Sequence, residues 1–338
     1  MNGRVITFGE SLLRLSPPNH LRWRQARVAE MFFGGAEANV AVSLAGFGLP
    51  VQYVTCLPDN ELGAACLESL RQQGVGTDFI KIRGDRLGLY FLETGSGARP
   101  SRVIYDRAHS SFATLDGEAI AWSQVFSQAG WFHWSGISPA VSAAAARATA
   151  NAVESASQND LLVSCDLNYR HTLWQWGESP SSVMPAMVER CDVLVANSAS
   201  LMLDQPDLPV GRNPDEAMEV CSRLAARYPK LRQIAMTCRE STPAGGQKYT
   251  GVLWQAGQLH TSQPFHLTQI VDRVGAGDAF MAGLIYGLYT FPEKTQRIID
   301  FATACAVIKH SIQGDANIAS VKEIEQLLAT QKGLDIIR

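Results

Sequence analysis

The chain has 338 residues, of which 46 % are hydrophobic and 18 % are charged, and its formal net charge is −3. This composition excludes extended disorder and provides enough apolar material for a large core. The nearly balanced charge gives no electrostatic footprint for nucleic acid or an anionic membrane, so neither is expected as a partner. The length allows two domains or one large α/β fold.

The cysteines and the apolar runs indicate where the protein is found. Seven cysteines are scattered without a C-x-x-C pair, a pattern that predicts reduced, buried thiols and no metal knuckle. The first residues lack the apolar segment of a signal peptide. The longest apolar run, Ala279–Phe291, is shorter than the ~20 residues of a membrane span. We therefore expect a cytoplasmic protein.

Short apolar runs alternate with amphipathic stretches along most of the chain. The runs predict buried strands at Val5–Phe8, Gln52–Cys56, Trp131–Ser135, Leu161–Cys165, Val193–Ala196 and Ile234–Thr237. The stretches predict helices at Glu61–Gln73, Ala140–Ser155 and Asp215–Tyr228. This alternation is typical of a mostly parallel, helix-covered sheet, in which ligands bind at the carboxyl ends of the strands.

One region interrupts this alternation. Two period-2 runs, Leu89–Glu93 and Arg102–Arg107, flank a Gly- and Pro-containing turn and predict a β-hairpin. The stretch Leu13–Phe33 has weak helical periodicity, with two prolines inside it. We interpret these pieces as a small β-rich lid inserted into an α/β core. The lid would comprise residues 13–33 and 86–109, and the core residues 1–12, 34–85 and 110–338.

The most informative segment is Val271–Phe280, VDRVGAGDAF, which opens an apolar helix. Its two glycines, Gly275 and Gly277, leave backbone N–H groups pointing outward at a helix N-terminus, where anions such as phosphate bind. Asp278 would lie beside that anion and could take a proton from a hydroxyl nucleophile. The alternative is that Asp278 only caps the helix. The segment is not a P-loop, because no Gly-Lys-Ser/Thr follows, and no G-x-G-x-x-G follows the first strand.

A second glycine motif, Gly34–Ala41 or GGAEANVA, precedes a helix rich in small residues. Gly34 and Gly35 would let a ligand approach the backbone, with Asn39 one turn further on; the alternative is a tight strand-to-helix turn. The two motifs resemble the amino- and carboxyl-terminal signatures of the ribokinase-like (PfkB) sugar kinases, in the same order and at about the same separation. The resemblance covers almost the whole chain. It implies the ribokinase-like α/β fold, a mostly parallel central sheet with helices on both faces and a small β-rich lid inserted near the N-terminal part.

Several segments, including Phe8–Glu10, Tyr105–Ala108 and Asp166–Arg170, resemble the 2-keto-3-deoxygluconate kinases of this family. The likeness implies that Asp278 is the base and that Gly275, Ala276 and Gly277 hold the transferring phosphoryl group. It implies substrate contacts at Gly34, Gly35, Asn39, Tyr90, Tyr105, Arg107, Arg170, Asp278 and Asp315.

Three of these contacts have alternatives. Alternation places Tyr105 and Arg107 on one face of the hairpin, but Arg107 could equally belong to a solvated edge strand. Arg170 could form an ion pair with Asp166, and Asp315 could belong to a plain Gly-Asp turn. Two arginines fit an anionic sugar better than a neutral one.

The resemblance implies that ATP lies over the C-terminal part, with Mg²⁺ bridging its phosphates; the residues that hold the metal stay open. The implied nucleotide contacts are Asn168, Arg170, Asn197, Thr237, Gly275 and Gly277. Two departures concern this site. Ser200 stands where the family usually has a glutamate that helps to hold Mg²⁺, and Cys238-Arg239-Glu240-Ser241 replaces a small glycine-bearing turn.

We therefore expect ATP-dependent phosphorylation of the terminal primary hydroxyl of a sugar acid, 2-keto-3-deoxygluconate, to its 6-phosphate. The alternatives are a kinase of a neutral sugar such as fructose or ribose, and a non-catalytic sugar-binding regulator that kept the fold. The expected partners are the sugar acid, ATP and a second copy of the chain. An exposed lid sheet carrying Trp23, Phe32 and Phe33 favours a homodimer.

Overall fold

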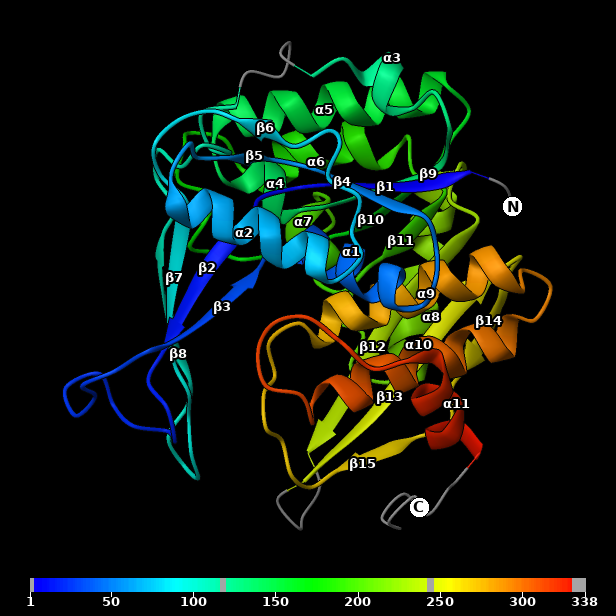
Figure 1. Ribbon diagram of the computed structural model, residues 1–338. Helices are drawn as coiled ribbons and strands as arrows, with labels where there is room; N and C mark the ends of the chain where they lie inside the picture. Colours follow the sequence, from blue (N-terminus) through cyan, green and yellow to red (C-terminus); the bar gives the residue numbers. More distant parts are fainter. Residues whose placement is uncertain (1–2, 116–119, 242–245, 330–338) are drawn as a thin grey trace.

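The computed structural model describes residues 3–115, 120–241 and 246–329, and its centre is a nine-stranded sheet (Figure 1). The strand order is β14-β13-β12-β11-β10-β9-β1-β4, with β15 also paired to β13. From β4 to β12 neighbouring strands are parallel, and β13 to β15 are added as antiparallel strands. The strands are β1 (Arg4–Phe8), β4 (Val51–Val54), β9 (Ala129–Ser135), β10 (Leu162–Asp166), β11 (Val193–Val195), β12 (Gln233–Ser241), β13 (Gln247–Gln255), β14 (Gln258–Thr261) and β15 (Phe265–Leu267).

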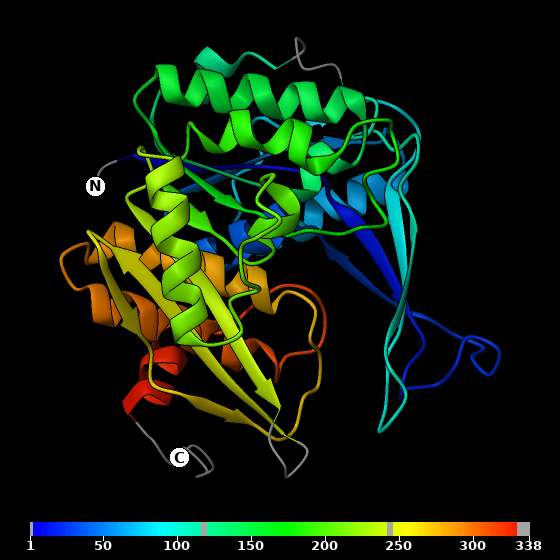
Figure 2. The ribbon, with the colours of Figure 1, turned by 180° about the vertical axis from the view of Figure 1, so that it is seen from behind.

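Helices cover both faces of this sheet because side chains of each strand alternate between two apolar cores. In β1, Val5 packs into one core, and Ile6 and Phe8 pack into the other. The face toward the viewer in Figure 1 carries α1 (Ala36–Gly46), α2 (Glu61–Gln72), α9 (Ala276–Thr290), α10 (Thr295–Lys309) and α11 (Val321–Ala329). The opposite face, in front in Figure 2, carries α3 (Trp122–Val125), α5 (Ala143–Gln158), α6 (Pro180–Val188) and α8 (Pro214–Arg227). Two short helices, α4 (Ile137–Ala140) and α7 (Ala199–Met202), follow β9 and β11.

A four-stranded sheet projects from the body of the molecule (Figure 1). Its order is β3-β2-β7-β8, with β2 and β7 parallel and the outer pairs antiparallel. The strands are β2 (Leu12–Ser16), β3 (Glu30–Gly34), β7 (Gly88–Glu93) and β8 (Arg102–Asp106); a small pair, β5 (Cys56–Leu57) and β6 (Lys81–Ile82), lies apart from it. The hairpin of β7 and β8 confirms the period-2 prediction and sets Tyr90 opposite Tyr105.

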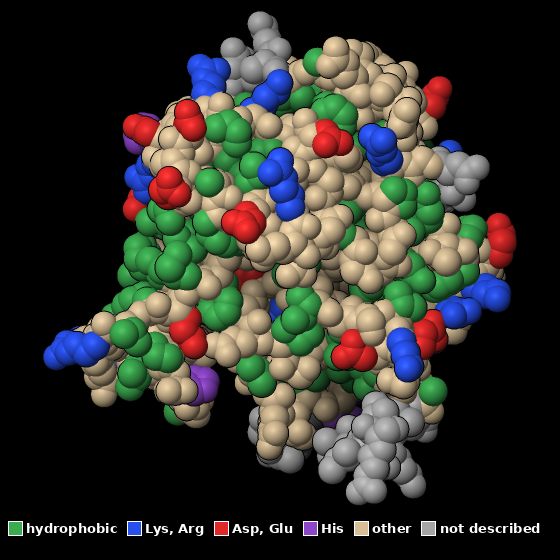
Figure 3. All heavy atoms as spheres, in the orientation of Figure 1, with side chains coloured by type: hydrophobic (Ala, Val, Ile, Leu, Met, Phe, Trp, Pro, Cys, Tyr) green, Lys and Arg blue, Asp and Glu red, His purple; other side chains and the backbone are tan. Residues whose placement is uncertain are grey.

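Hydrophobic side chains are exposed on this projecting sheet (Figure 3). They are not the ones expected from the sequence. Trp23, Phe32 and Phe33 are half-buried, and the Trp23 ring packs edge-on against Phe91. Met31 and Ile104 are exposed instead, at 54 % and 60 %. Phe33 packs against the apolar core, and the Arg14 guanidinium lies 5.1 Å from the ring centre of Phe32, which accounts for the partial burial of both rings.

Three element boundaries differ from the sequence prediction. The expected strand Gln52–Cys56 divides into β4 and β5, and the expected helix Ala140–Ser155 divides at Ser142, whose side chain caps α5. The expected strand Ile234–Thr237 continues to Ser241, because β13 pairs with it along its whole length. All seven cysteines are buried and free, as predicted. Within the described ranges, no helix is long and apolar enough to cross a membrane.

Candidate active site

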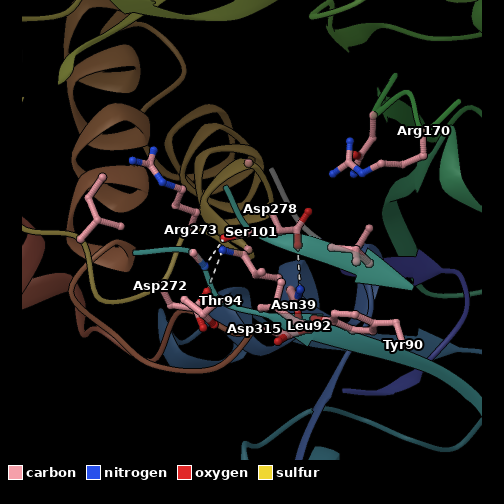
Figure 4. A pocket seen from close by; sticks show the side chains of 18 of the residues that line it. Asn39, Tyr90, Leu92, Thr94, Ser101, Arg170, Asp272, Arg273, Asp278 and Asp315 are labelled. Carbon is pink, nitrogen blue, oxygen red and sulfur yellow. Dashed lines mark hydrogen bonds between the residues drawn. The ribbon is translucent and has the colours of Figure 1, made fainter. Parts of the chain in front are cut away.

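A cavity of about 1110 Å³ lies between the small sheet, the carboxyl ends of β10 and β11, and the start of α9. It joins segments that are far apart in sequence, as Figure 4 shows for Asn39, Asp278 and Arg170. Of the predicted site residues, the cavity is lined by Gly35, Asn39, Tyr90, Tyr105, Arg107, Asn168, Arg170, Asn197, Thr237, Gly275, Gly277, Asp278 and Asp315. Two predicted residues, Gly34 and Ala276, are not among its lining residues.

Asp278 is buried in the first turn of α9 and is held from a different helix. The side-chain amide of Asn39, in α1, donates a hydrogen bond to Asp278 Oδ2 at 2.7 Å (Figure 4). The helix is capped by Gly275, and no side chain forms its N-terminal capping bond. The alternative in which Asp278 serves only as the helix cap is therefore wrong. Its second carboxylate oxygen remains available to a ligand in the cavity.

The surroundings of Asp278 favour its protonated form near neutral pH. Burial raises the pKa of Asp278 to about 7, and the nearby carboxylates of Asp166 and Glu37 act in the same direction. The hydrogen bond from Asn39 and the charge of Arg170 lower this pKa. A carboxylate with a pKa near the working pH is suited to accept a proton and release it again.

The loop before α9 has room only for glycine at its first position. Gly275 has φ +79°, and a Cβ there would lie 1.7 Å from the backbone oxygen of Asp315. Gly277 is different, because a Cβ added to it would meet no atom within 4 Å, so its backbone faces open space in the cavity. Ala276 is buried and is the first residue of α9. The loop thus presents backbone N–H groups at the positive end of the helix dipole.

A buried network ties this loop to the small sheet. Arg14, in β2, pairs with Asp272 at 2.6 Å and with Asp315 at 3.0 Å. Asp272 also accepts hydrogen bonds from the N–H groups of Val274 and Gly314. The hydroxyl of Tyr90 donates a hydrogen bond to Asp315. Tyr90 and Asp315 both line the cavity. They were expected to contact the substrate, but here they form a hydrogen bond with each other.

The glycine pair before α1 is required by packing. A Cβ on Gly34 would lie 2.3 Å from Asp315 Oδ2. The side chain of Asp315 therefore occupies the space next to Gly34 where we expected a ligand. Gly35 has φ +142°, and a Cβ there would lie 2.2 Å from the backbone oxygen of Glu10. The alternative of a tight strand-to-helix turn therefore describes both glycines, although Gly35 also lines the cavity.

Arg107 lies one residue beyond β8 and is not the solvated edge residue of the alternative prediction. Its side chain is 6 % exposed, and its Nε donates to Glu10 Oε2 at 2.7 Å. Ser110 donates to the other oxygen of Glu10. The guanidinium lies 5.9 Å from the ring centre of Tyr105. Arg107 is thus a fixed, partly neutralised charge at the cavity wall, and its partner Glu10, which is buried and is not among the lining residues, was not singled out from the sequence.

The carboxyl ends of β10 and β11 bring most of the remaining residues to the cavity, as predicted for this class of sheet, and Thr237 joins them from the middle of β12. Asp166 ends β10 and Asn168 follows it with φ +37°. Arg170 is exposed and forms no ion pair with Asp166. Burial raises the pKa of Asp166 to about 6, and the charge of Arg170 acts against this rise. Asn197 and Thr237 hydrogen-bond to each other through main chain and side chain.

Both departures from the family pattern are visible in the structure. Ser200 lies in the first turn of α7, so no carboxylate stands there. Cys238 to Ser241 continue β12, and Arg239 lines the cavity with its guanidinium 5.3 Å from the ring centre of Tyr249. Among the described residues, no group of three or more His, Cys, Asp and Glu side chains could hold a metal ion.

Several buried charges went unnoticed in the sequence. Arg14 is buried on the face of β2 that also carries Leu12 and Ser16, and the one available signal was a charged residue in the middle of an otherwise apolar strand. Glu37 is fully buried and accepts hydrogen bonds from Ser135 and Ser138, and burial raises its pKa to about 7. Their partners lie about a hundred or more residues away, so no local pattern predicts the pairs.

Comparisons with known proteins agree with this geometry. The model of the pfkB family carbohydrate kinases matches residues 4–321. A 2-dehydro-3-deoxygalactonokinase of Haloferax volcanii is 31 % identical over 330 residues, which cover 97 % of each chain. The crystal structure of 2-dehydro-3-deoxygluconokinase from Thermotoga maritima is 38 % identical with a TM-score of 0.91, and covers 98 % of this chain and 99 % of that one. A fructokinase with bound ATP from Xylella fastidiosa, at 22 % identity and a TM-score of 0.75 over 98 % and 100 % of the two chains, shares the fold. The chain therefore belongs to the pfkB family of carbohydrate kinases, with the ribokinase-like fold, and is a sugar kinase.

Proposed function

We propose that this kinase transfers the γ-phosphoryl group of ATP to the terminal primary hydroxyl of a 2-keto-3-deoxy sugar acid, 2-keto-3-deoxygluconate, giving the 6-phosphate. Use of ATP, and usually of a divalent metal ion, follows from membership of the family. The observation that carries the proposal is one cavity lined by Asp278, by the glycine loop of α9, and by several arginines, among them Arg107 and Arg170. Relatives that act on such sugar acids support the substrate class.

In this proposal Asp278 is the base. Asn39 holds Oδ2, and the other oxygen accepts the proton of the sugar hydroxyl. That hydroxyl oxygen forms a bond to the γ-phosphorus while the bond to the β-phosphate oxygen breaks, and ADP leaves. The transition state is loose, so that alignment and charge stabilisation contribute more than base strength. The N–H groups of the loop Gly275–Gly277 would hold the transferring group.

Mg²⁺ fits this cavity as an ion that arrives with the nucleotide. It needs few protein ligands, because phosphate oxygens and water complete its coordination. Asp166 is the residue that we assign to it, because its side chain lines the cavity and its one hydrogen bond within the described residues comes from the N–H of Asn168. When bound, the ion would neutralise charge that develops on the phosphates.

The substrate contacts follow from the same walls. We propose that Arg107 and Arg170 face the sugar carboxylate, with Tyr90 and Tyr105 against the sugar chain. The small sheet would act as the lid, closing over the sugar and excluding water, which limits hydrolysis of ATP. Its exposed hydrophobic side chains would form the contact between two copies of the chain in a homodimer.

Release of ADP with a panel of sugars and sugar acids tests the proposal. We expect the largest kcat/KM with 2-keto-3-deoxygluconate. The 2-keto-3-deoxygalactonate epimer, which differs at one stereocentre, is the second candidate, since the Haloferax relative is a kinase of that acid. Preference for fructose or ribose would replace the proposal by the neutral-sugar alternative. Sugar binding without turnover on any compound would support the regulator.

A further inference from the structure

Lys309 is a buried cation beside the proposed phosphate site, at the last position of α10. Its side chain is 0 % exposed. Its ammonium donates a hydrogen bond to the backbone oxygen of Ile312 at 2.9 Å. Burying an ammonium costs far more than burying an apolar side chain of similar length, so packing alone does not account for a lysine here.

Two buried carboxylates lie near Lys309 and favour its charged form. Burial lowers the pKa of Lys309, whereas Asp272 and Asp315 raise it. The same two carboxylates pair with Arg14. Two cations and two carboxylates therefore lie together in the interior, so that each buried charge has opposite charge near it.

This cluster lies directly behind the loop that begins α9. The N–H of Val271 donates to the backbone oxygen of His310 at 2.8 Å, and the N–H of Gly314 donates to Asp272. A Cβ on Gly275 would lie 3.3 Å from Lys309 Cε. The lysine stem therefore packs against the residue that caps α9, where the helix dipole is already positive.

We propose that Lys309 is a positioning residue for the nucleotide phosphates: its buried ammonium holds the 312–315 segment against the glycine loop and adds a fixed positive charge behind the N–H groups of that loop. The inference rests on the proposed function, which puts the ATP phosphates at Gly275–Gly277. A charge in this desolvated position is weakly screened by salt. It acts on the triphosphate and not on the adenosine part of the nucleotide.

The experiment compares two ligands on three proteins by calorimetry. The ligands are the non-hydrolysable β,γ-imido analogue of ATP, with Mg²⁺, and adenosine, which carries no phosphate. The proteins are the wild type, Lys309→Met and Lys322→Met. Lys322→Met is the matched control, because it removes the same charge from an exposed position in α11. We expect Lys309→Met to lower affinity for the triphosphate by about 10- to 100-fold, which is the effect of removing one buried charge several Å from the phosphates. Adenosine binding should be unchanged. The control should change neither.

A second variant separates the charge from the hydrogen bond. Lys309→Gln removes the charge and keeps an N–H donor, on a side chain one atom shorter than lysine, so it should show the same selective loss, with a raised KM for ATP and an unchanged KM for the sugar. Equal losses for both ligands, unchanged triphosphate binding, or failure of both variants to fold would each overturn the proposal and assign Lys309 to fold stability. Failure of the proposed function is distinguishable, because the wild type itself would then not bind the triphosphate or not release ADP.

Discussion

Asp278 and Arg170 face the same cavity, but the structure holds them in different ways. Asp278 is buried and fixed by Asn39, as Arg107 is fixed by Glu10; we call the three lining residues, together with Glu10 behind Arg107, the floor of the cavity. Arg170 is exposed, and its hydrogen bond within the described residues goes to the backbone oxygen of its neighbour Tyr169; we call it the rim. Groups fixed before substrate arrives need no reorganisation in the transition state, whereas exposed groups must be ordered by the ligand. The floor should therefore govern turnover and substrate choice, and the rim should govern binding.

The largest effect is expected at the centre of the floor. Asp278→Asn keeps the shape and removes the proton acceptor, so kcat should fall by ~10²–10⁴-fold, the range for a positioned general base. Binding of the ATP analogue should be nearly intact. The variant should also melt no lower than the wild type at pH 8. Folding raises the pKa of Asp278 to about 7, so ionisation of this carboxyl makes the wild-type protein less stable as the pH rises toward 7, and asparagine does not ionise. Unimpaired turnover, or loss of folding, would contradict the assigned role.

Arg107 should show the next largest effect, provided that it faces the sugar carboxylate. Arg107→Ala should cost about 2–4 kcal/mol in kcat/KM for the sugar acid, the range for a lost desolvated charge pair. Part of that cost is structural, because Glu10 would be left buried without its partner. A neutral analogue with CH₂OH in place of the carboxylate separates the parts, because it shares only the structural cost. Arg107→Lys should also be impaired, because it loses the planar fork.

The wild type and Arg107→Ala, each measured with the sugar acid and with the neutral analogue, give a coupling energy between Arg107 and the carboxylate. A coupling energy near zero would contradict the role in substrate choice that we assign to the floor. The floor would then include a purely structural ion pair, and the neutral-sugar alternative would gain support. The comparison would be sharpened if the coupling were large for Arg107→Ala and small for the same cycle at Arg170.

A smaller effect is expected at the rim. Arg170→Ala removes an exposed charge that forms no ion pair within the described residues, so the protein should melt close to the wild-type temperature. The KM values for ATP and for the sugar acid should rise by about 10-fold, as for one charge-assisted hydrogen bond formed only in the complex. Steady-state kinetics in low and high salt measure this, and the loss should shrink in high salt. A fall in kcat as large as that of Asp278→Asn would place Arg170 among the catalytic groups.

The sequence predicted the residues whose roles depend on local pattern. The central sheet, the hairpin, and the glycine loop that places Asp278 in the first turn of a helix all follow from alternation or contiguous motifs. The partners in the buried ion pairs could not be predicted in this way. Glu10 and Arg107 are 97 residues apart, and Arg14 and Asp315 are 301 apart, so that only the folded chain shows which charge neutralises which. For the same reason Gly34 looked like a ligand contact, although its missing Cβ makes room for Asp315.

The smallest expected effect tests how the floor sets the pKa of its own base. Asp278 must be ionised to accept a proton, so kcat/KM for the sugar acid should fall as the pH drops through about 7. The hydrogen bond from Asn39 lowers this pKa, and Asn39→Ala should therefore move the acid limb to higher pH, by at most about one unit. Ser43→Ala is the matched control in the same helix, because its hydroxyl bonds to the backbone oxygen of Asn39 and does not contact Asp278. The acid limb of the pH profile would belong to another carboxyl of the cavity if it stayed in place in Asn39→Ala or persisted in the residual activity of Asp278→Asn. Asp166 is the first candidate, because burial raises its pKa to about 6.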